Sequence, residues 1–218
     1  TMPKFDLVEF LINIQNFKCT FLFIAPPIAV ALAKHPVVDQ FDISSVHTMF
    51  SGAAPLDGET GEAAASRLHA RMLQGYGMTE LSPVSHAMVA NRTDVPVSSI
   101  GELLPNVQAK LVDVTTGEEI TEVGENGETL PGELWVRGPN VMVGYLGRRD
   151  ATAETLDADG FLHTGDVAVY HAGGYFSIVD RVKELIKYKG YQIAPAELEA
   201  LLLSHPKVMD AACIGVLD

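Results

Sequence analysis

The first 81 residues alternate between apolar runs of strand length and runs with helical periodicity. Between residues 5 and 17 the apolar side chains recur at spacings of three and four residues, and Asp6 can serve as the N-cap, so we expect a helix there. The strands and helices expected next cover residues 20–25, 26–34, 46–50, 57–70 and 72–74. An order of strand, helix, strand, helix and strand predicts a parallel α/β sheet with right-handed crossovers.

A different pattern begins near residue 82. Short alternating runs, separated by Gly, Pro and Asp, favour antiparallel β-structure in a barrel or a small sandwich. These runs cover residues 107–114, 133–136, 141–145, 167–170 and 175–179. Residues 115–130 are rich in Glu, Gly and Thr and are expected to form an exposed hairpin loop. A helix is expected from about Pro195 to Ser204. The changes of pattern along the chain predict three parts, residues 1–81, 82–179 and 180–218.

Two loops rich in small residues follow neighbouring predicted strands, Ser51–Pro55 and Gly75–Glu80. In open α/β sheets, ligands bind at the carboxyl ends of the strands, so a nucleotide could approach both loops. Tyr76 offers a flat face for a base and Thr79 a hydroxyl group. Glu80 is a hard oxygen ligand that suits Mg²⁺ held with substrate phosphates. Taken alone, either loop could also be an ordinary turn.

Positive charge is concentrated near the C-terminus of a chain whose net charge is −13. Four basic residues fall within nine positions: Arg181, Lys183, Lys187 and Lys189. A local positive patch on an acidic protein suggests an anionic ligand, although such a cluster can also be a solvated basic face.

Composition excludes several classes of protein. The strongly negative charge argues against non-specific binding to nucleic acid or to an anionic membrane. The longest apolar run, residues 19–33, contains Pro26-Pro27 and is too short to span a bilayer. Cys19 and Cys213 lie in apolar runs without metal-like spacing, so buried thiols in a reducing compartment are expected.

Two stretches carry a resemblance to a known family. Residues 178–202 contain Lys-Tyr-Lys-Gly-Tyr-Gln followed by Ala-Pro-Ala-Glu-Leu-Glu, and residues 74–80 read Gln-Gly-Tyr-Gly-Met-Thr-Glu. Both resemble the adenylate-forming superfamily of acyl-CoA synthetases, 4-coumarate–CoA ligases and luciferases, most closely its 4-coumarate–CoA ligase-like branch. The resemblance covers essentially all 218 residues. It implies the C-terminal part of the large N-domain, a parallel α/β subdomain and an antiparallel β-barrel subdomain, followed by the start of a small α+β lid domain.

The resemblance also implies roles for individual residues. Thr79, Glu80, Lys187 and Gln192 match catalytic positions, with Glu80 as the metal ligand. Nucleotide- or acyl-adenylate-binding positions are Gly52, Ala53, Ala54, Gln74, Gly75, Tyr76, Gly77, Thr79, Met88, Asp166, Arg181, Lys183 and Lys187. Asp166, in His163-Thr-Gly-Asp, matches a carboxylate that binds both ribose hydroxyls, and Asp180 matches the hinge. Lys189 and Gly190 match CoA-binding positions.

The acyl pocket is less well defined. Pro83 and Val84 resemble a pair that shapes the acyl end of the pocket in 4-coumarate–CoA ligases, and Met88 resembles its far side. The segment from Leu81 to Met88 is one residue longer than the family pattern, with Ser85-His86 as the extra material. The acid is therefore not predicted. Gly132–Leu146 resembles a family strand pair, to which we assign no chemistry.

The resemblance implies a parent enzyme that joins a small carboxylic acid to CoA with ATP and Mg²⁺, in phenylpropanoid or fatty acid metabolism. A medium- or long-chain fatty acyl-CoA ligase, a luciferase-like oxidation and a non-catalytic AMP-binding module are the alternatives. The family's Ser/Thr/Gly-rich phosphate loop and its lid lysine do not occur in these residues. We therefore expect a piece of a longer chain, inactive by itself. A parent without a signal peptide or membrane span is expected to be cytoplasmic or peroxisomal.

Overall fold

The computed structural model describes residues 2–188, 191–203, 205, 208 and 211–216. The chain divides into two compact units, one made of Thr1–Met78 and His86–Glu102 and the other of Thr79–Ser85 and Leu103–Asp218. The division into 1–81, 82–179 and 180–218 stays a prediction.

The first unit contains the parallel sheet that the alternating pattern predicts. Its elements are α1 (Leu7–Phe17), β1 (Phe21–Ile24), α2 (Pro26–Lys34), the 3-10 helix η1 (Pro36–Gln40), β2 (Thr48–Ser51), α3 (Gly58–Leu68) and β3 (Arg71–Gly77). Strand β1 pairs with β2, and β2 with β3, both in parallel. Asp6 caps α1 as predicted, because its Oδ1 accepts a hydrogen bond of 2.9 Å from the backbone N–H of Glu9.

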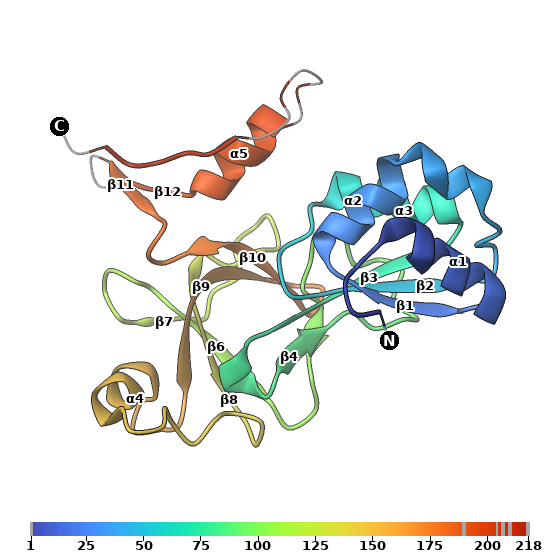
Figure 1. Cartoon of the computed structure of the whole chain (residues 1–218). Helices are drawn as coiled ribbons and strands as arrows, with labels where there is room; N and C mark the ends of the chain where they lie inside the picture. The colour runs from blue at the N-terminus through green and yellow to red at the C-terminus, as the bar shows by residue number, and fades with distance from the viewer. Residues whose placement is uncertain (1, 189–190, 204, 206–207, 209–210, 217–218) are drawn as a thin grey trace. The chain divides into compact units, whose positions relative to one another are not determined.

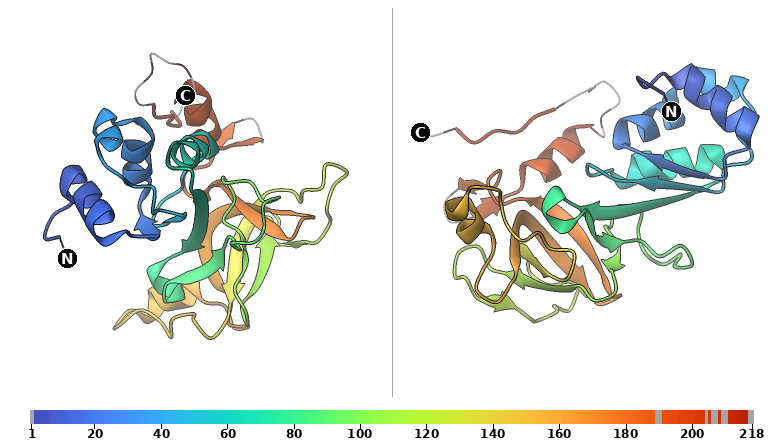
Figure 2. Two further views of the ribbon diagram at one scale, coloured as in Figure 1. Left: turned by 90° about the vertical axis from the view of Figure 1, so that its right-hand side faces the viewer. Right: turned by 60° about the horizontal axis from the view of Figure 1, so that its bottom comes forward.

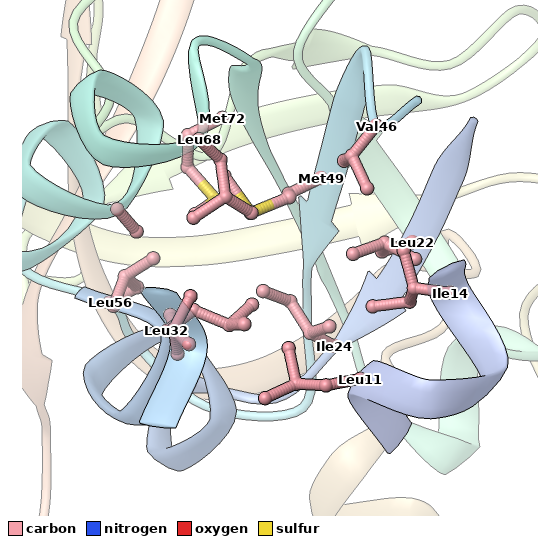
Figure 3. Packing of buried hydrophobic residues seen from close by; sticks show 13 residues of the cluster. Leu11, Ile14, Leu22, Ile24, Leu32, Val46, Met49, Leu56, Leu68 and Met72 are labelled. Carbon is pink, nitrogen blue, oxygen red and sulfur yellow. The ribbon is translucent and has the colours of Figure 1, made fainter. Parts of the chain in front are cut away.

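The core of this unit lies between the sheet and its helices. Helices α1, α2 and α3 cover one face of β1, β2 and β3 (Figure 1). Alternate residues of β1, Leu22 and Ile24, are buried, whereas Phe21 and Phe23 are exposed on the other face. Leucine, isoleucine, valine and methionine side chains from the three helices and the strands meet in one cluster (Figure 3). This burial explains why the apolar periodicity located these elements.

Strands β4 (Val84–Ala87) and β5 (Glu102–Leu103) extend the order of this sheet to β1-β2-β3-β4-β5. A short 3-10 helix, η2 (Thr79–Leu81), precedes β4. The sequence did not predict β4, because its central residues Ser85 and His86 are polar. Both are nevertheless fully buried.

The second unit contains the predicted antiparallel structure. Its strands are β6 (Gln108–Val112), β7 (Glu119–Ile120), β8 (Gly132–Arg137), β9 (Leu162–His171) and β10 (Tyr175–Arg181). They form one antiparallel sheet in the order β10-β9-β8-β6-β7, which is visibly twisted (Figure 2). Within the described residues β10 and β7 are the two edges of this sheet, so the expected closed barrel is not formed.

Several local predictions for this unit are wrong. Residues 141–145 form no strand in the described chain, and the helix α4 (Arg149–Thr155), which buries none of its described residues, was not predicted. The predicted helix near residue 195 is confirmed as α5 (Pro195–Leu203), and it follows the two-stranded sheet of β11 (Ile186–Tyr188) and β12 (Tyr191–Ile193). Cys19 and Cys213 are free and only partly buried, rather than fully buried.

Candidate functional site

In the first unit, strand β2 ends at the buried Ser51, and the loop that follows it is exposed at Ala53, Ala54 and Pro55. Ala53 has a φ of 73°, in the left-handed region that residues other than glycine seldom adopt. Such conformations cost energy and gather at ligand-binding sites, so the strain agrees with the predicted ligand contact of Ala53. Gly52 donates its N–H to the carbonyl oxygen of Ile24 at 3.2 Å, which ties the loop to β1.

Gln74, near the middle of β3, joins this loop to its neighbours. Its Nε2 donates to the carbonyl oxygens of Leu56, at 2.9 Å, and Val97, and its Oε1 accepts from the N–H of Leu56 at 3.2 Å. Met88 lies beside it, since the N–H of Met88 donates to the carbonyl oxygen of Gln74 at 2.8 Å. The structure therefore brings two predicted site residues together. The side chain of Gln74 supports the loop, and its contact with nucleotide stays a prediction.

The next residues of β3 fit a site that needs close backbone approach. A Cβ atom added to Gly75 would lie 2.6 Å from the ring of Phe50 and 3.1 Å from the carbonyl oxygen of His86, so a side chain there would require the Phe50 ring to shift. The ring of Tyr76 is partly exposed, and its contact with the His86 ring is edge-on, with centroids 5.8 Å apart. Complete burial of His86 lowers the pKa of its imidazole to about 3, so the ring is neutral at physiological pH.

The predicted metal ligand Glu80 belongs to the second unit, where a later segment holds it. The Tyr145 hydroxyl donates to Glu80 Oε1 at 2.7 Å, and the N–H of Met142 donates to the Glu80 carbonyl oxygen at 2.8 Å. Hydrogen bonding to this carboxylate raises the pKa of Tyr145. Asn140 Nδ2 donates to the carbonyl oxygens of Leu81 and Val84, each at 2.9 Å. Residues 140–145 therefore fix the conformation of the segment that carries Thr79, Glu80, Pro83 and Val84.

Asp166 and Arg181 lie together on the neighbouring strands β9 and β10. They are Cα partners, and Arg181 Nε is 3.5 Å from Asp166 Oδ1. Asp180 is 5% exposed and is the Cα partner of Val167 on β9, so the predicted hinge residue is anchored in the sheet. Lys183 is exposed in the turn that follows β10.

Two further predicted residues lie in the two-stranded sheet of β11 and β12. Lys187 and Gln192 are Cα partners across β11 and β12. Lys189 and Gly190 lie outside the described residues. Within the part of the chain that the structure describes, no group of three or more His, Cys, Asp or Glu side chains could hold a metal ion.

Sequence reasoning did not identify Tyr145 and Asn140 as residues that hold the predicted site. Each lies in Gly132–Leu146, to which no chemistry was assigned. Tyr145 contacts a residue 65 positions away, and spacing along the sequence cannot reveal such a contact.

Comparison with known proteins gives a consistent result. The family model described as AMP-binding enzyme matches residues 1–146. A probable 4-coumarate–CoA ligase 1 of Dictyostelium discoideum is 50% identical over 217 residues, which is 99% of this chain and 38% of that protein. A 4-coumarate–CoA ligase of Vanilla planifolia is 45% identical over 221 residues, which covers all of this chain and 39% of that protein. The chain therefore spans well under half the length of these relatives.

A solved structure agrees. The amide bond synthetase McbA from Marinactinospora thermotolerans matches 100% of this chain and 42% of its own chain, with a TM-score of 0.86 and 30% identity. The two sheets and their order are therefore those of a known fold.

Proposed function

Because this chain belongs to the family of AMP-binding enzymes, we propose that it is part of an ATP-dependent carboxylate–CoA ligase of the 4-coumarate–CoA ligase type. The observation that carries the proposal is 50% identity to such a ligase over 99% of this chain. In the first half-reaction a carboxylate oxygen attacks the α-phosphorus of ATP, which forms an acyl-adenylate and releases pyrophosphate. In the second, the CoA thiol attacks the acyl carbon, which forms a thioester and releases AMP.

The exposure and the contacts of individual residues support the proposed roles. Tyr76 would stack on adenine, and its partly exposed ring supports this role. Asp166 would accept hydrogen bonds from the ribose hydroxyls, beside the cationic Arg181. Thr79 is exposed and would donate to a phosphate oxygen. These contacts bind and orient ATP so that the attacking carboxylate meets it in one geometry.

Glu80 would hold Mg²⁺ together with substrate phosphates. A single carboxylate suits this ion, because Mg²⁺ is usually bound by one or two carboxylates and keeps several water ligands. Tyr145 occupies one carboxylate oxygen of Glu80, so the other oxygen can face the ion. When bound, Mg²⁺ would neutralise charge on the phosphates.

The basic residues that follow the proposed hinge Asp180 would serve the lid. Lys183, Lys187 and Lys189 come after it in sequence. A turn about Asp180 would exchange the lid face presented to the acyl-adenylate, and closure would exclude water from an intermediate that hydrolyses.

The test is acid-dependent exchange of pyrophosphate into ATP by the full-length protein, followed by thioester formation on addition of CoA. The acids should include 4-coumarate, caffeate, octanoate and palmitate. Highest activity with a hydroxycinnamate supports the proposal. Highest activity with octanoate or palmitate would assign it to the fatty acyl-CoA ligases instead. Absence of exchange with every acid would favour a non-catalytic nucleotide-binding module.

A second candidate differs only in the acceptor. The match to an amide bond synthetase supports an amine in place of the CoA thiol. Adding CoA or an amine separately to the preformed acyl-adenylate distinguishes the two, because only the true acceptor accelerates AMP release. The higher identity to the CoA ligases favours CoA.

The proposal also concerns the compartment in which the enzyme acts. No helix within the described residues is long and apolar enough to cross a membrane. We propose the cytoplasm or the peroxisome as its compartment, and microscopy of the tagged full-length protein tests this.

A further inference from the structure

Asp166 lies on a bulge in β9. Glu133 of β8 is paired with Val167, and Trp135 with His163, so that Leu134 alone lies opposite Thr164, Gly165 and Asp166. Gly165 has a φ of 74°, which permits this departure from the ladder. Bulges next to binding sites redirect side chains, and this one determines where the Asp166 carboxylate points.

The polar groups of the bulge are satisfied by a small set of contacts. The Thr164 hydroxyl donates to the Leu134 carbonyl oxygen at 2.7 Å and accepts from the Asp166 N–H at 3.1 Å. The Gly165 carbonyl oxygen accepts from the Val182 N–H at 2.8 Å. The Gly165 N–H donates to Glu133 Oε1 at 3.0 Å. A side chain of β8 therefore holds the residue that immediately precedes Asp166.

Glu133 is itself held in place. The indole N–H of Trp135 donates to its Oε2 at 2.8 Å. The Trp135 ring stacks on the ring of His163, with centroids 3.6 Å apart and planes 16° apart. The Glu133 carboxylate thus bridges the bulge and a fixed aromatic ring, and hydrogen bonds to an ionised carboxylate are stronger than neutral ones.

We propose that Glu133 is a positioning residue that acts through Asp166 on the ribose of the nucleotide. The inference rests on the proposed function, because it takes Asp166 as the ribose ligand. Loss of the Glu133 carboxylate frees the Gly165 N–H, the bulge shifts, and the Asp166 carboxylate leaves the position that receives the ribose hydroxyls. If Glu133 served only the fold, its substitution would lower stability. It would not change the preference for nucleotides with ribose hydroxyls over nucleotides without them.

The test uses the full-length protein and the ratio of kcat/KM for ATP to that for 2′,3′-dideoxy-ATP, measured by acid-dependent pyrophosphate exchange. Asp166→Ala should remove most of the preference for ATP. Glu133→Ala should lower the preference on the order of 10-fold, because small displacements of positioning groups have effects of this size or larger. The exposed Glu122→Gln is the matched control and should keep the wild-type ratio.

Two more variants separate hydrogen bonding from packing. In Glu133→Gln the amide has one acceptor oxygen and one donor NH₂ group. The NH₂ group must therefore face another donor, either the Trp135 indole N–H or the Gly165 N–H. The preference for ATP should fall. Adding Trp135→Phe removes the indole donor and leaves the Gln carbonyl free for Gly165. The double variant should therefore recover part of the preference that Glu133→Gln loses. These two variants keep the test informative if Glu133→Ala does not fold.

The outcomes are distinguishable. A higher preference for ATP in the double variant than in Glu133→Gln supports the inference. A preference in the double variant that is equal to or below that of Glu133→Gln overturns it. If Asp166→Ala loses the preference while both Glu133 variants keep it, the inference fails and the proposed function stands. If Asp166→Ala keeps the preference, the ribose role and the inference fail together.

Discussion

The ion pair between Asp166 and Arg181 contributes little to stability, because the Arg181 side chain is 67% exposed. Exposed pairs of this kind contribute roughly 0–1 kcal/mol. We therefore predict that Asp166→Ala raises the KM for ATP on the order of 10-fold or more in the full-length protein while the melting temperature changes little. Steady-state kinetics and thermal melting measure both, with the exposed Asp159→Ala as control. A large loss of stability with an unchanged KM would mean that Asp166 serves the fold.

His86 leads to a prediction about acid sensitivity. Burial lowers its pKa in the folded protein from 6.5 to about 3. Below pH 6.5 the unfolded chain therefore binds a proton that the folded chain does not. Stability is greatest above that pH and falls by up to about 1.4 kcal/mol per pH unit as the pH decreases toward 3.

In His86→Gln this contribution is absent, so its free energy of unfolding should depend less steeply on pH between 6.5 and 5. Urea unfolding at several pH values measures the slope. The exposed His47→Gln should retain the wild-type slope. Equal slopes in all three proteins would mean that His86 does not remain neutral in the fold.

At the residue scale, the sequence allowed site residues to be predicted, but it did not reveal the residues that hold them. Glu80 and Asp166 stand in short motifs bounded by glycine, and motifs of that kind can be recognised locally. Tyr145 and Glu133 act through contacts with Glu80 and Gly165, which are 65 and 32 positions away. Only the pairing of distant segments in the fold brings such groups together.

Among the elements, those with one buried face were predicted well. Helix α2 was expected at residues 26–34 and is found at Pro26–Lys34, because Pro26-Pro27 fixes its first turn. The alternation of residues 141–145 was misleading, because Val143 is fully exposed rather than packed in a sheet. Strand β4 was missed for the opposite reason, since its polar residues Ser85 and His86 are buried. The periodicity of apolar residues predicts a helix or strand only where the apolar residues are the buried ones and the polar residues are exposed.

The two-stranded sheet that carries Lys187 leads to a prediction for the proposed lid. The resemblance places Lys187 near the acyl-adenylate only after the lid has turned. We predict that Lys187→Ala in the full-length enzyme slows thioester formation on the order of 100-fold and leaves acyl-adenylate formation largely intact. Single-turnover measurements of each half-reaction test this, with the exposed Lys34→Ala as control. Equal losses, or a loss confined to adenylation, would place Lys187 on the other face of the lid.

At the scale of the whole molecule, the chain carries only some of the family's motifs. It spans 38% and 39% of the length of the two ligases compared with it. The phosphate loop and the lid lysine of the family do not occur in its sequence. We predict that the purified 218-residue chain alone catalyses no acid-dependent pyrophosphate exchange. Exchange above the level of a no-enzyme control would show that these residues suffice for adenylation.

The identity of the nucleotide product tests the central claim most directly. Full-length protein, ATP, Mg²⁺, CoA and the preferred acid can be followed by ³¹P NMR, with the thioester quantified in the same sample. Adenylation and thioester formation predict AMP and pyrophosphate in equal amounts, matched by the thioester, and none of the three without the acid. Formation of ADP and phosphate with the thioester would contradict the account, because the acid would then be activated through an acyl phosphate.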